Sequence, residues 1–318
     1  MYVYLFQRVI SAFLTLLGMS VVIFVLLRLV PGNIVDILFA SAGFVNPAAK
    51  QEIARELGLD QPIPVQYGHW LRDITRGELG KSYRYEIPAW QVIKPRIPVT
   101  AELAFFALLI AVLLGIPIGV LSAIRQDTAT DYLLRSLSLA GLSMPSFWLG
   151  MVIILFLVSY FGWIPSMTYV SPFEDFKAHV LQFFFPALAV GYRSSALIMR
   201  ITRSSMLDVL REDYIRTAWA KGQREWIVVF GHALSNATLP VITVIGIEFA
   251  FMIGGLVVTE TVFNLPGVAR YLVDAILWRD YPVVQNLVMF IAIVVVIANL
   301  TVDLLYGWLD PRIRYGVR

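Results

Sequence analysis

The chain has 318 residues, of which 58% are hydrophobic and 15% charged, and its mean hydropathy is +0.74. This composition leaves too little polar surface to coat a water-soluble globule of this length, so it predicts an integral membrane protein. The net charge of +3 gives little support to a nucleic-acid partner, and the absence of cysteine excludes disulfides, cysteine-ligated metals and thiol chemistry.

Six apolar runs are long enough to cross a hydrocarbon core about 30 Å thick, which takes about 20 helical residues. They cover residues 9–30, 100–124, 133–160, 180–201, 239–262 and 283–306. We therefore expect an all-α integral membrane protein with six transmembrane helices. Gly115 and Gly119 form a GxxxG pattern in the second run, which permits close helix contact either within the chain or with another subunit.

A long loop, residues 31–98, separates the first two runs. Asn46 and Pro47 are helix-start signals and Gly58 is a helix-end signal, so a helix is predicted over residues 46–58. Such a loop either docks an extracytoplasmic partner or covers the helical bundle, and the sequence leaves both interpretations open.

Lysine and arginine are unevenly divided between the two sides of the predicted bundle. Twelve lie in the termini and short connections of one side, and three in the short connections of the other. Because positively charged connections stay in the cytoplasm, both termini and the connection after the fourth run are predicted to be cytoplasmic. The expected organisation is a first helix with its long external loop (1–98), a five-helix core (99–307) and a short cytoplasmic tail (308–318).

Residues 206–237, in the cytoplasmic connection, combine charge with helical periodicity on either side of Gly222. We expect two short amphipathic helices that meet at this glycine, which tolerates a left-handed turn. Acids are mixed with bases along the segment, which fits a protein partner better than helices that only lie on lipid headgroups. The apolar stripes are Leu207, Leu210, Tyr214 and Ala218 before the glycine, and Trp226, Val229, Phe230, Ala233 and Leu234 after it.

Two charges lie inside the predicted spans: Arg193 in the fourth and Glu248 in the fifth. Charges are costly in hydrocarbon, so the two are candidates for the translocation path or for a structural pair that faces the bundle interior. In a proton-coupled secondary transporter, the second functional hypothesis, Glu248 would carry the proton. A membrane-embedded enzyme has no support, because the sequence holds no HExxH, GxSxG or clustered carboxylates, so we expect no catalytic or metal-binding residues.

Stretches along the whole chain resemble the permease subunit of binding-protein-dependent ABC importers. They are similar to the first-permease (B-type) subunit of the family that transports dipeptides, oligopeptides and nickel. These stretches include LVPGN after the first run, RIPVTAEL at the start of the second, SMPSFWLG in the third and VDLLYGWLDPRIRY near the end. The resemblance implies a type I ABC importer permease fold.

Within this resemblance, residues 206–237 match the cytoplasmic coupling loop, or EAA motif, which implies docking in a cleft of the ATPase subunit. Gly222 matches the motif glycine and Ala218 its second alanine. The chain departs from the general motif at Arg216, where a glutamate is usual, at Thr217, and at Ser235, where a proline is common. The residues expected at the ATPase contact are Leu210, Asp213, Tyr214, Arg216, Thr217, Ala218, Lys221, Gly222, Trp226, Phe230, His232 and Leu234.

The chain holds no complete GxxxxGK[ST] phosphate loop, so it lacks the usual ATP-binding motif. The resemblance implies that it binds no cofactor and that two ATP-binding subunits use ATP and Mg on its behalf. It further implies a second homologous permease, an extracytoplasmic binding protein, membrane lipid around the bundle and a bacterial or archaeal cytoplasmic membrane. Peptides are the expected cargo; glutathione, nickel complexes and oligosaccharides stay open.

Overall fold

The computed structural model describes residues 2–29, 35, 54–55, 58–166 and 168–309. The regular structure of these residues is helical, apart from one isolated bridge between Lys81 and Pro88. The predicted all-α class is therefore confirmed. Most of the helix predicted over 46–58, and nearly all of the predicted tail, lie outside the described residues.

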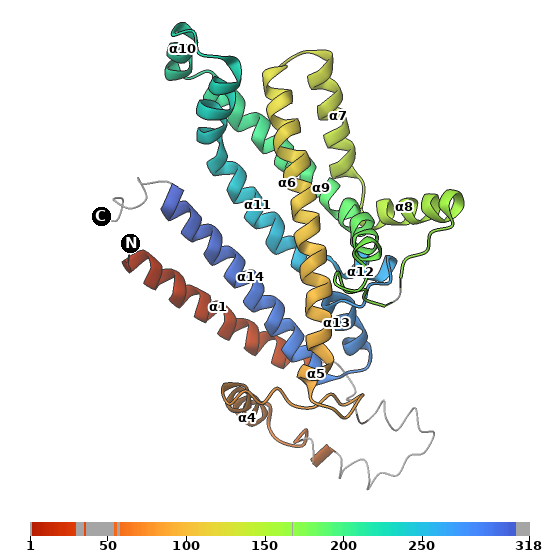
Figure 1. Cartoon of the computed structure of the whole chain (residues 1–318). Helices are drawn as coiled ribbons and strands as arrows, with labels where there is room; N and C mark the ends of the chain where they lie inside the picture. The colour runs from red at the N-terminus through yellow and green to blue at the C-terminus, as the bar shows by residue number, and fades with distance from the viewer. Residues whose placement is uncertain (1, 30–34, 36–53, 56–57, 167, 310–318) are drawn as a thin grey trace. The chain divides into compact units, whose positions relative to one another are not determined.

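The chain divides into two compact units, which are described separately. Unit 1 comprises residues 1–99 and 267–297, and unit 2 comprises residues 100–266 and 298–318. The helices of unit 1 are α1 (Tyr2–Leu29), α4 (Ile63–Thr75), α5 (Ala89–Ile93), η1 (Lys94–Arg96), α13 (Val268–Leu277) and residues 281–297 of α14 (Tyr281–Leu309), whose remaining residues belong to unit 2. Those of unit 2 are most of α6 (Ile97–Ile124), α7 (Ala129–Ser143), α8 (Ser146–Phe161), α9 (Phe176–Leu210), α10 (Asp213–Ala220), η2 (Ile227–Leu234), α11 (Ser235–Gly255) and α12 (Val257–Val262). Figure 1 shows their order along the chain.

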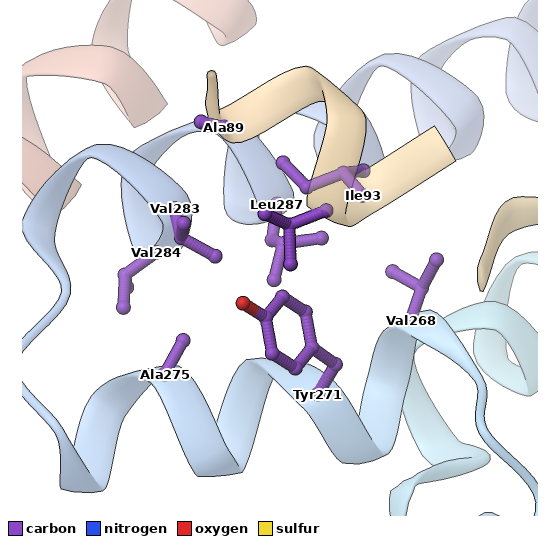
Figure 2. Packing of buried hydrophobic residues seen from close by; sticks show 9 residues of the cluster. Ala89, Ile93, Val268, Tyr271, Ala275, Val283, Val284 and Leu287 are labelled. Atoms are coloured by element: carbon purple, nitrogen blue, oxygen red, sulfur yellow. The ribbon is translucent and has the colours of Figure 1, made fainter. Parts of the chain in front are cut away.

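Unit 1 is built around apolar residues that come from three helices. Ala89 and Ile93 of α5 pack with Tyr271 of α13 and Leu287 of α14, and the Tyr271 ring lies among the aliphatic side chains in Figure 2. Polar contacts tie the external loop to the same helices: the Ser82 hydroxyl donates to Asp280, and the backbone N–H of Tyr83 donates to the same carboxylate at 3.1 Å. The long loop predicted from the sequence thus has a packed C-terminal half.

The described residues include four helices that are long and apolar enough to span a membrane, or five if one bent pair counts as a single span. The expectation of one continuous third helix over 133–160 is wrong. Helix α7 ends at Ser143, α8 starts at Ser146, and the two are bent by 100°. Met144 and Pro145 are extended between them, because a proline disfavours helical backbone at the residue before it. The fourth predicted span lies inside α9 but is not among these candidates, so six spans stay a prediction.

In unit 2, α6 and α9 approach closely through glycines. A Cβ atom added to Gly115 would lie 2.7 Å from Ile198, one on Gly119 would lie 2.7 Å from Thr202, and one on Gly191 would lie 2.6 Å from the backbone oxygen of Ala107. These distances leave no room for a side chain. Of the two interpretations of the GxxxG pattern, close packing within the chain is the one observed.

Candidate functional site

The candidate site is the segment 206–237, which joins α9 to α11 at one end of unit 2 (Figure 1). Helix α9 ends at Leu210, and Glu212 is extended, so the chain turns before α10 begins at Asp213. Asp213, Arg216 and Thr217 are exposed on this short helix. Arg216 Nη1 lies 3.2 Å from Asp213 Oδ1, but a pair so exposed contributes little stability and leaves both groups available to a partner.

Helix α10 ends in a glycine-dependent cap. Gly222 has φ of +74°, its N–H donates to Trp219 O at 2.9 Å, and the next N–H, that of Gln223, donates to Ala218 O at 3.3 Å. This pair of bonds is the Schellman motif, in which the residue after the cap is left-handed and is usually glycine. The predicted turn at Gly222 is confirmed, and its geometry explains why a residue with a side chain is unfavourable there.

A buried core fixes α10 to the rest of unit 2. Ile215 and Ala218 of α10 pack with Val228 and Ala233 of η2 and with Ala123 at the end of α6. This core contains part of the predicted stripes: Ala218, Val229 and Ala233 are buried, and Leu207, Leu210 and Leu234 are partly buried against the same cluster. Ala218, which the resemblance places at the ATPase contact, is thus largely enclosed by the core. The core therefore holds the segment in a defined position.

The remaining stripe residues, Tyr214, Trp226 and Phe230, stay outside the buried core, and all three are among the residues expected at the ATPase contact. Tyr214 is 45% exposed, Trp226 62% and Phe230 55%. Because large aromatic side chains that stay exposed outside the lipid-facing helices mark contact surfaces, they favour an outward, partner-facing role. Desolvation raises the pKa of the Tyr214 hydroxyl, and the Glu212 carboxylate raises it further, whereas a hydrogen bond to Asn236 lowers it. The net shift is upward, so the hydroxyl stays protonated at neutral pH.

The segment after Gly222 differs from the predicted second short helix. Residues Ile227–Leu234 form a π-helix, η2, that passes directly into α11 at Ser235. The segment therefore has one separate short helix, α10, followed by the wide first turns of a long helix. Lys221 is exposed beside the glycine, and His232 is partly buried, with its Nε2 close to the side chain of Gln223.

A recess of about 330 Å³ opens beside α10. Its walls come from the ends of α6 and α9, from α10 and from the start of η2, and they are largely apolar, with Arg211 and Glu225 among them. Leu207, Leu210 and Trp219 supply part of the apolar wall. The site thus presents both projecting aromatic side chains and a concave surface.

The two intramembrane charges are not brought together. Arg193 is exposed on α9, Glu248 is buried on α11, and among the described residues no ion pair joins them. The expected structural pair is therefore not formed. The described part of the chain also contains no group of three His, Asp or Glu residues placed to hold a metal ion.

Sequence reasoning missed a polar cluster close to the candidate site. Asp131 of α7 is fully buried and binds Arg203 of α9 and Ser122 of α6. The only signal in the sequence is the Thr128-x-x-Asp131 spacing of a helix start, and the structure confirms that Thr128 caps α7. The pairing with Arg203 is a tertiary contact that this spacing does not indicate.

Two family models match the chain. One, described as "Binding-protein-dependent transport system inner membrane component", matches residues 115–315, and its N-terminal companion matches residues 1–104. Curated relatives include the dipeptide transport system permease protein DppB of Alkalihalophilus pseudofirmus, 37% identical, with 99% of this chain and 100% of that protein covered. The Escherichia coli K12 DppB protein is 39% identical, with 95% of each chain covered. A probable peptide ABC transporter permease of Sinorhizobium fredii is 41% identical, with 98% of this chain and 99% of that protein covered.

Solved structures share the fold. The inward-facing MetNI methionine ABC transporter matches with a TM-score of 0.58 at 16% identity, covering 70% of this chain and 98% of that chain. An amino acid ABC transporter crystallised with histidines matches with a TM-score of 0.50 at 18% identity, covering 70% of this chain and 94% of that chain. These likenesses confirm the type I importer permease architecture.

Proposed function

Since this chain belongs to the family of binding-protein-dependent transport system inner membrane components, we propose that residues 206–237 are the coupling loop through which it receives the energy of ATP hydrolysis. The chain is a multi-pass permease subunit of a peptide ABC importer in the inner membrane. Such a subunit works with an ATPase, a binding protein and a second permease. The proposal concerns how these parts act through this chain.

The observation that carries the proposal is the division of the coupling loop into a buried and an exposed side. Ile215 and Ala218 anchor α10 in the core of unit 2, while Tyr214, Trp226 and Phe230 project outward. A partner can bind a rigid helix through its exposed aromatic groups, and a displacement of that helix then moves the helices beneath it. The sequence itself holds no complete phosphate loop, so ATP and Mg act on the partner subunits.

Two copies of the ATP-binding subunit, or two related ones, would engage the coupling loops of two homologous permeases. Symmetric or pseudo-symmetric pairing follows from the small size of a single bundle, which supplies half of the translocation path. Closure of the ATPase pair then displaces α10, and the packed helices shift between discrete arrangements that open the path to one side at a time.

The proposed cargo is a dipeptide or short oligopeptide that an extracytoplasmic binding protein delivers. The names of the curated relatives support this cargo class. Because a binding protein captures the peptide first, the permease path needs less selectivity of its own.

The test is ATP-dependent uptake by the full complex in proteoliposomes. Labelled dipeptide should enter only with ATP and the binding protein present, and entry should persist when an ionophore collapses the proton gradient. Uptake that follows the proton gradient without ATP would refute the proposal. The Glu248→Gln variant supplies a second measurement, because it should keep ATP-driven uptake, whereas a proton carrier would lose transport.

A further inference from the structure

A buried ion pair joins α7 to α9 close to the coupling loop. Asp131, in the first turn of α7, is fully buried, and Arg203 of α9 binds its carboxylate with two N–H groups. Arg203 Nε lies 2.9 Å from Oδ1 and Nη2 lies 2.7 Å from Oδ2. Two parallel bonds of this kind fix the relative orientation of the two groups as well as their distance.

The same carboxylate also holds the end of α6. The Ser122 hydroxyl of α6 donates to Asp131 Oδ1, and the backbone N–H of Asp127, in the turn between α6 and α7, donates to Oδ2 at 3.1 Å. A carboxylate offers about four acceptor positions, so its capacity is filled by donors from three segments. We call the set of Ser122, Asp127, Asp131 and Arg203 the junction.

The turn between α6 and α7 depends on the junction. Asp127 has φ of +60°, a left-handed backbone that residues other than glycine seldom adopt, though Asp is among the more tolerant. Its N–H is one of the donors to Asp131, so the buried carboxylate helps to hold the turn in this conformation.

The junction lies where the coupling loop meets the helices. Arg203 is about two helical turns before Leu210, where α9 ends, and Ser122 is close to Ile124, where α6 ends. Helix α10 rests on the same two helix ends, because Ile215 shares its core with Val120 and Ala123 of α6 and with Met206 of α9. A displacement of α10 therefore reaches α6 and α9 beside the junction.

We infer that the junction makes α6, α7 and α9 move as one body when the coupling loop is displaced, so that Asp131 and Arg203 are positioning residues for the coupling of ATP hydrolysis to transport. The inference rests on the proposed function. Contacts beyond the junction agree with it: α6 packs closely on α9 at Gly115 and Gly119, and Ser138 Oγ of α7 donates to Ala196 O of α9 at 2.9 Å.

The first test measures peptide transported per ATP hydrolysed by the full complex in proteoliposomes. Asp131→Asn should lower this ratio about tenfold, the effect of losing a buried charged hydrogen bond. Arg203→Lys keeps the charge but loses the two-pronged geometry, so a decrease of about threefold is expected. The matched control is Arg200→Lys, which makes the same replacement at an exposed arginine of α9 outside the junction and should leave the ratio unchanged.

The second test replaces the ion pair by a covalent link between α7 and α9. A Cβ atom on Gly141 would lie 3.4 Å from Cβ of Ala196, close to the range of disulfides, and the chain has no other cysteine. The Tyr192 ring lies 3.1 Å from that Cβ atom and must shift by a few tenths of an ångström to accommodate it. In Gly141→Cys/Ala196→Cys, oxidation should leave transport intact, because the two helices move together. In the Asp131→Asn background, oxidation should restore the ratio of peptide transported to ATP hydrolysed, and reduction should return it to the lowered value.

The outcomes separate the two proposals. A wild-type complex with no ATP-dependent uptake would refute the proposed function itself. If the wild-type complex shows ATP-dependent uptake and the Asp131→Asn and Arg203→Lys variants transport as much peptide per ATP as wild type, only the role of the junction is overturned. The same holds if the cross-link blocks transport. If Asp131→Asn does not assemble, Arg203→Lys and the cross-linked chain decide the question.

Discussion

His232 Nε2 lies 2.8 Å from Gln223 Oε1, so a side-chain hydrogen bond joins the residue after Gly222 to the π-helix η2. An amide oxygen only accepts, so Nε2 carries the hydrogen and donates it. The bond closes the short stretch between α10 and η2 and fixes the direction in which the coupling loop leaves its turn.

Loss of this bond should loosen the loop. In Gln223→Ala, the fold stays intact because the bond contributes only about 1 kcal/mol, but peptide transported per ATP should fall several-fold. Transport and hydrolysis measured in the same proteoliposomes check this. Gln91→Ala, which truncates an exposed glutamine of α5, should behave as wild type; equal ratios in both variants would show that the bond has no coupling role.

Replacement of Gly222 should disturb the cap of α10. Ala at φ of +74° costs about 1 to 2 kcal/mol, and Pro additionally removes the N–H that bonds to Trp219 O. We expect Gly222→Ala to reduce coupling and Gly222→Pro to abolish it, with membrane insertion unaffected. Gly231→Ala is the control, because a Cβ there makes only an ordinary contact, 3.8 Å from Ile227. Normal uptake by Gly222→Pro would contradict the importance of the turn.

The exposed and buried sides of the loop should respond differently. Trp226→Ala with Phe230→Ala removes exposed aromatic groups, so the permease should keep its thermal stability while its affinity for the ATPase and its uptake fall at least tenfold. Ile215→Ala removes a fully buried side chain and should destabilise unit 2 by about 2 to 5 kcal/mol. Melting temperatures of the purified permease measure the loss of stability, and ATPase pull-down measures the loss of binding. A lower melting temperature of the Trp226→Ala/Phe230→Ala variant would show instead that these aromatic side chains belong to the core.

The glycine seam between α6 and α9 should tolerate no added carbon. In Gly115→Ala the new Cβ would lie 2.7 Å from Ile198 and 2.9 Å from the backbone oxygen of Ser195, and such overpacking costs about 1 to 3 kcal/mol. Thermal unfolding in detergent measures the loss. Gly254→Ala, in α11 with nothing within 4 Å of its Cβ, should be neutral or slightly stabilising. Equal melting temperatures for the two variants would rule out the tight seam.

Periodicity and composition predicted the helical class, the membrane location and the turn at Gly222, because each depends on local spacing. The break at Pro145 is hidden in the sequence because the apolar run continues through it without a charged residue, although Pro145 itself and the serines beside it, Ser143 and Ser146, are visible there. The orientations of Tyr214, Trp226 and Phe230 depend on which helices lie beneath the loop. A local sequence pattern does not indicate which helices these are.

The pairing of Asp131 with Arg203 shows the same limit at the candidate site. Each residue alone resembles an ordinary charge near the end of an apolar run, and only the close approach of α7 to α9 makes them partners. A sequence pattern indicates which face of a single helix is apolar, whereas this contact depends on how several helices pack.

The wide winding of Ile227–Leu234 has a consequence for everything that follows it in α11. A π turn accommodates about one residue more than an α turn. Rewinding of that stretch into regular α geometry would therefore twist the downstream helix by about 100° and shift it axially by about 1.5 Å. Glu248, further along α11, would then face a different neighbour without any hinge in between. The stretch beside the proposed ATPase contact thus sets the rotational phase of a membrane helix.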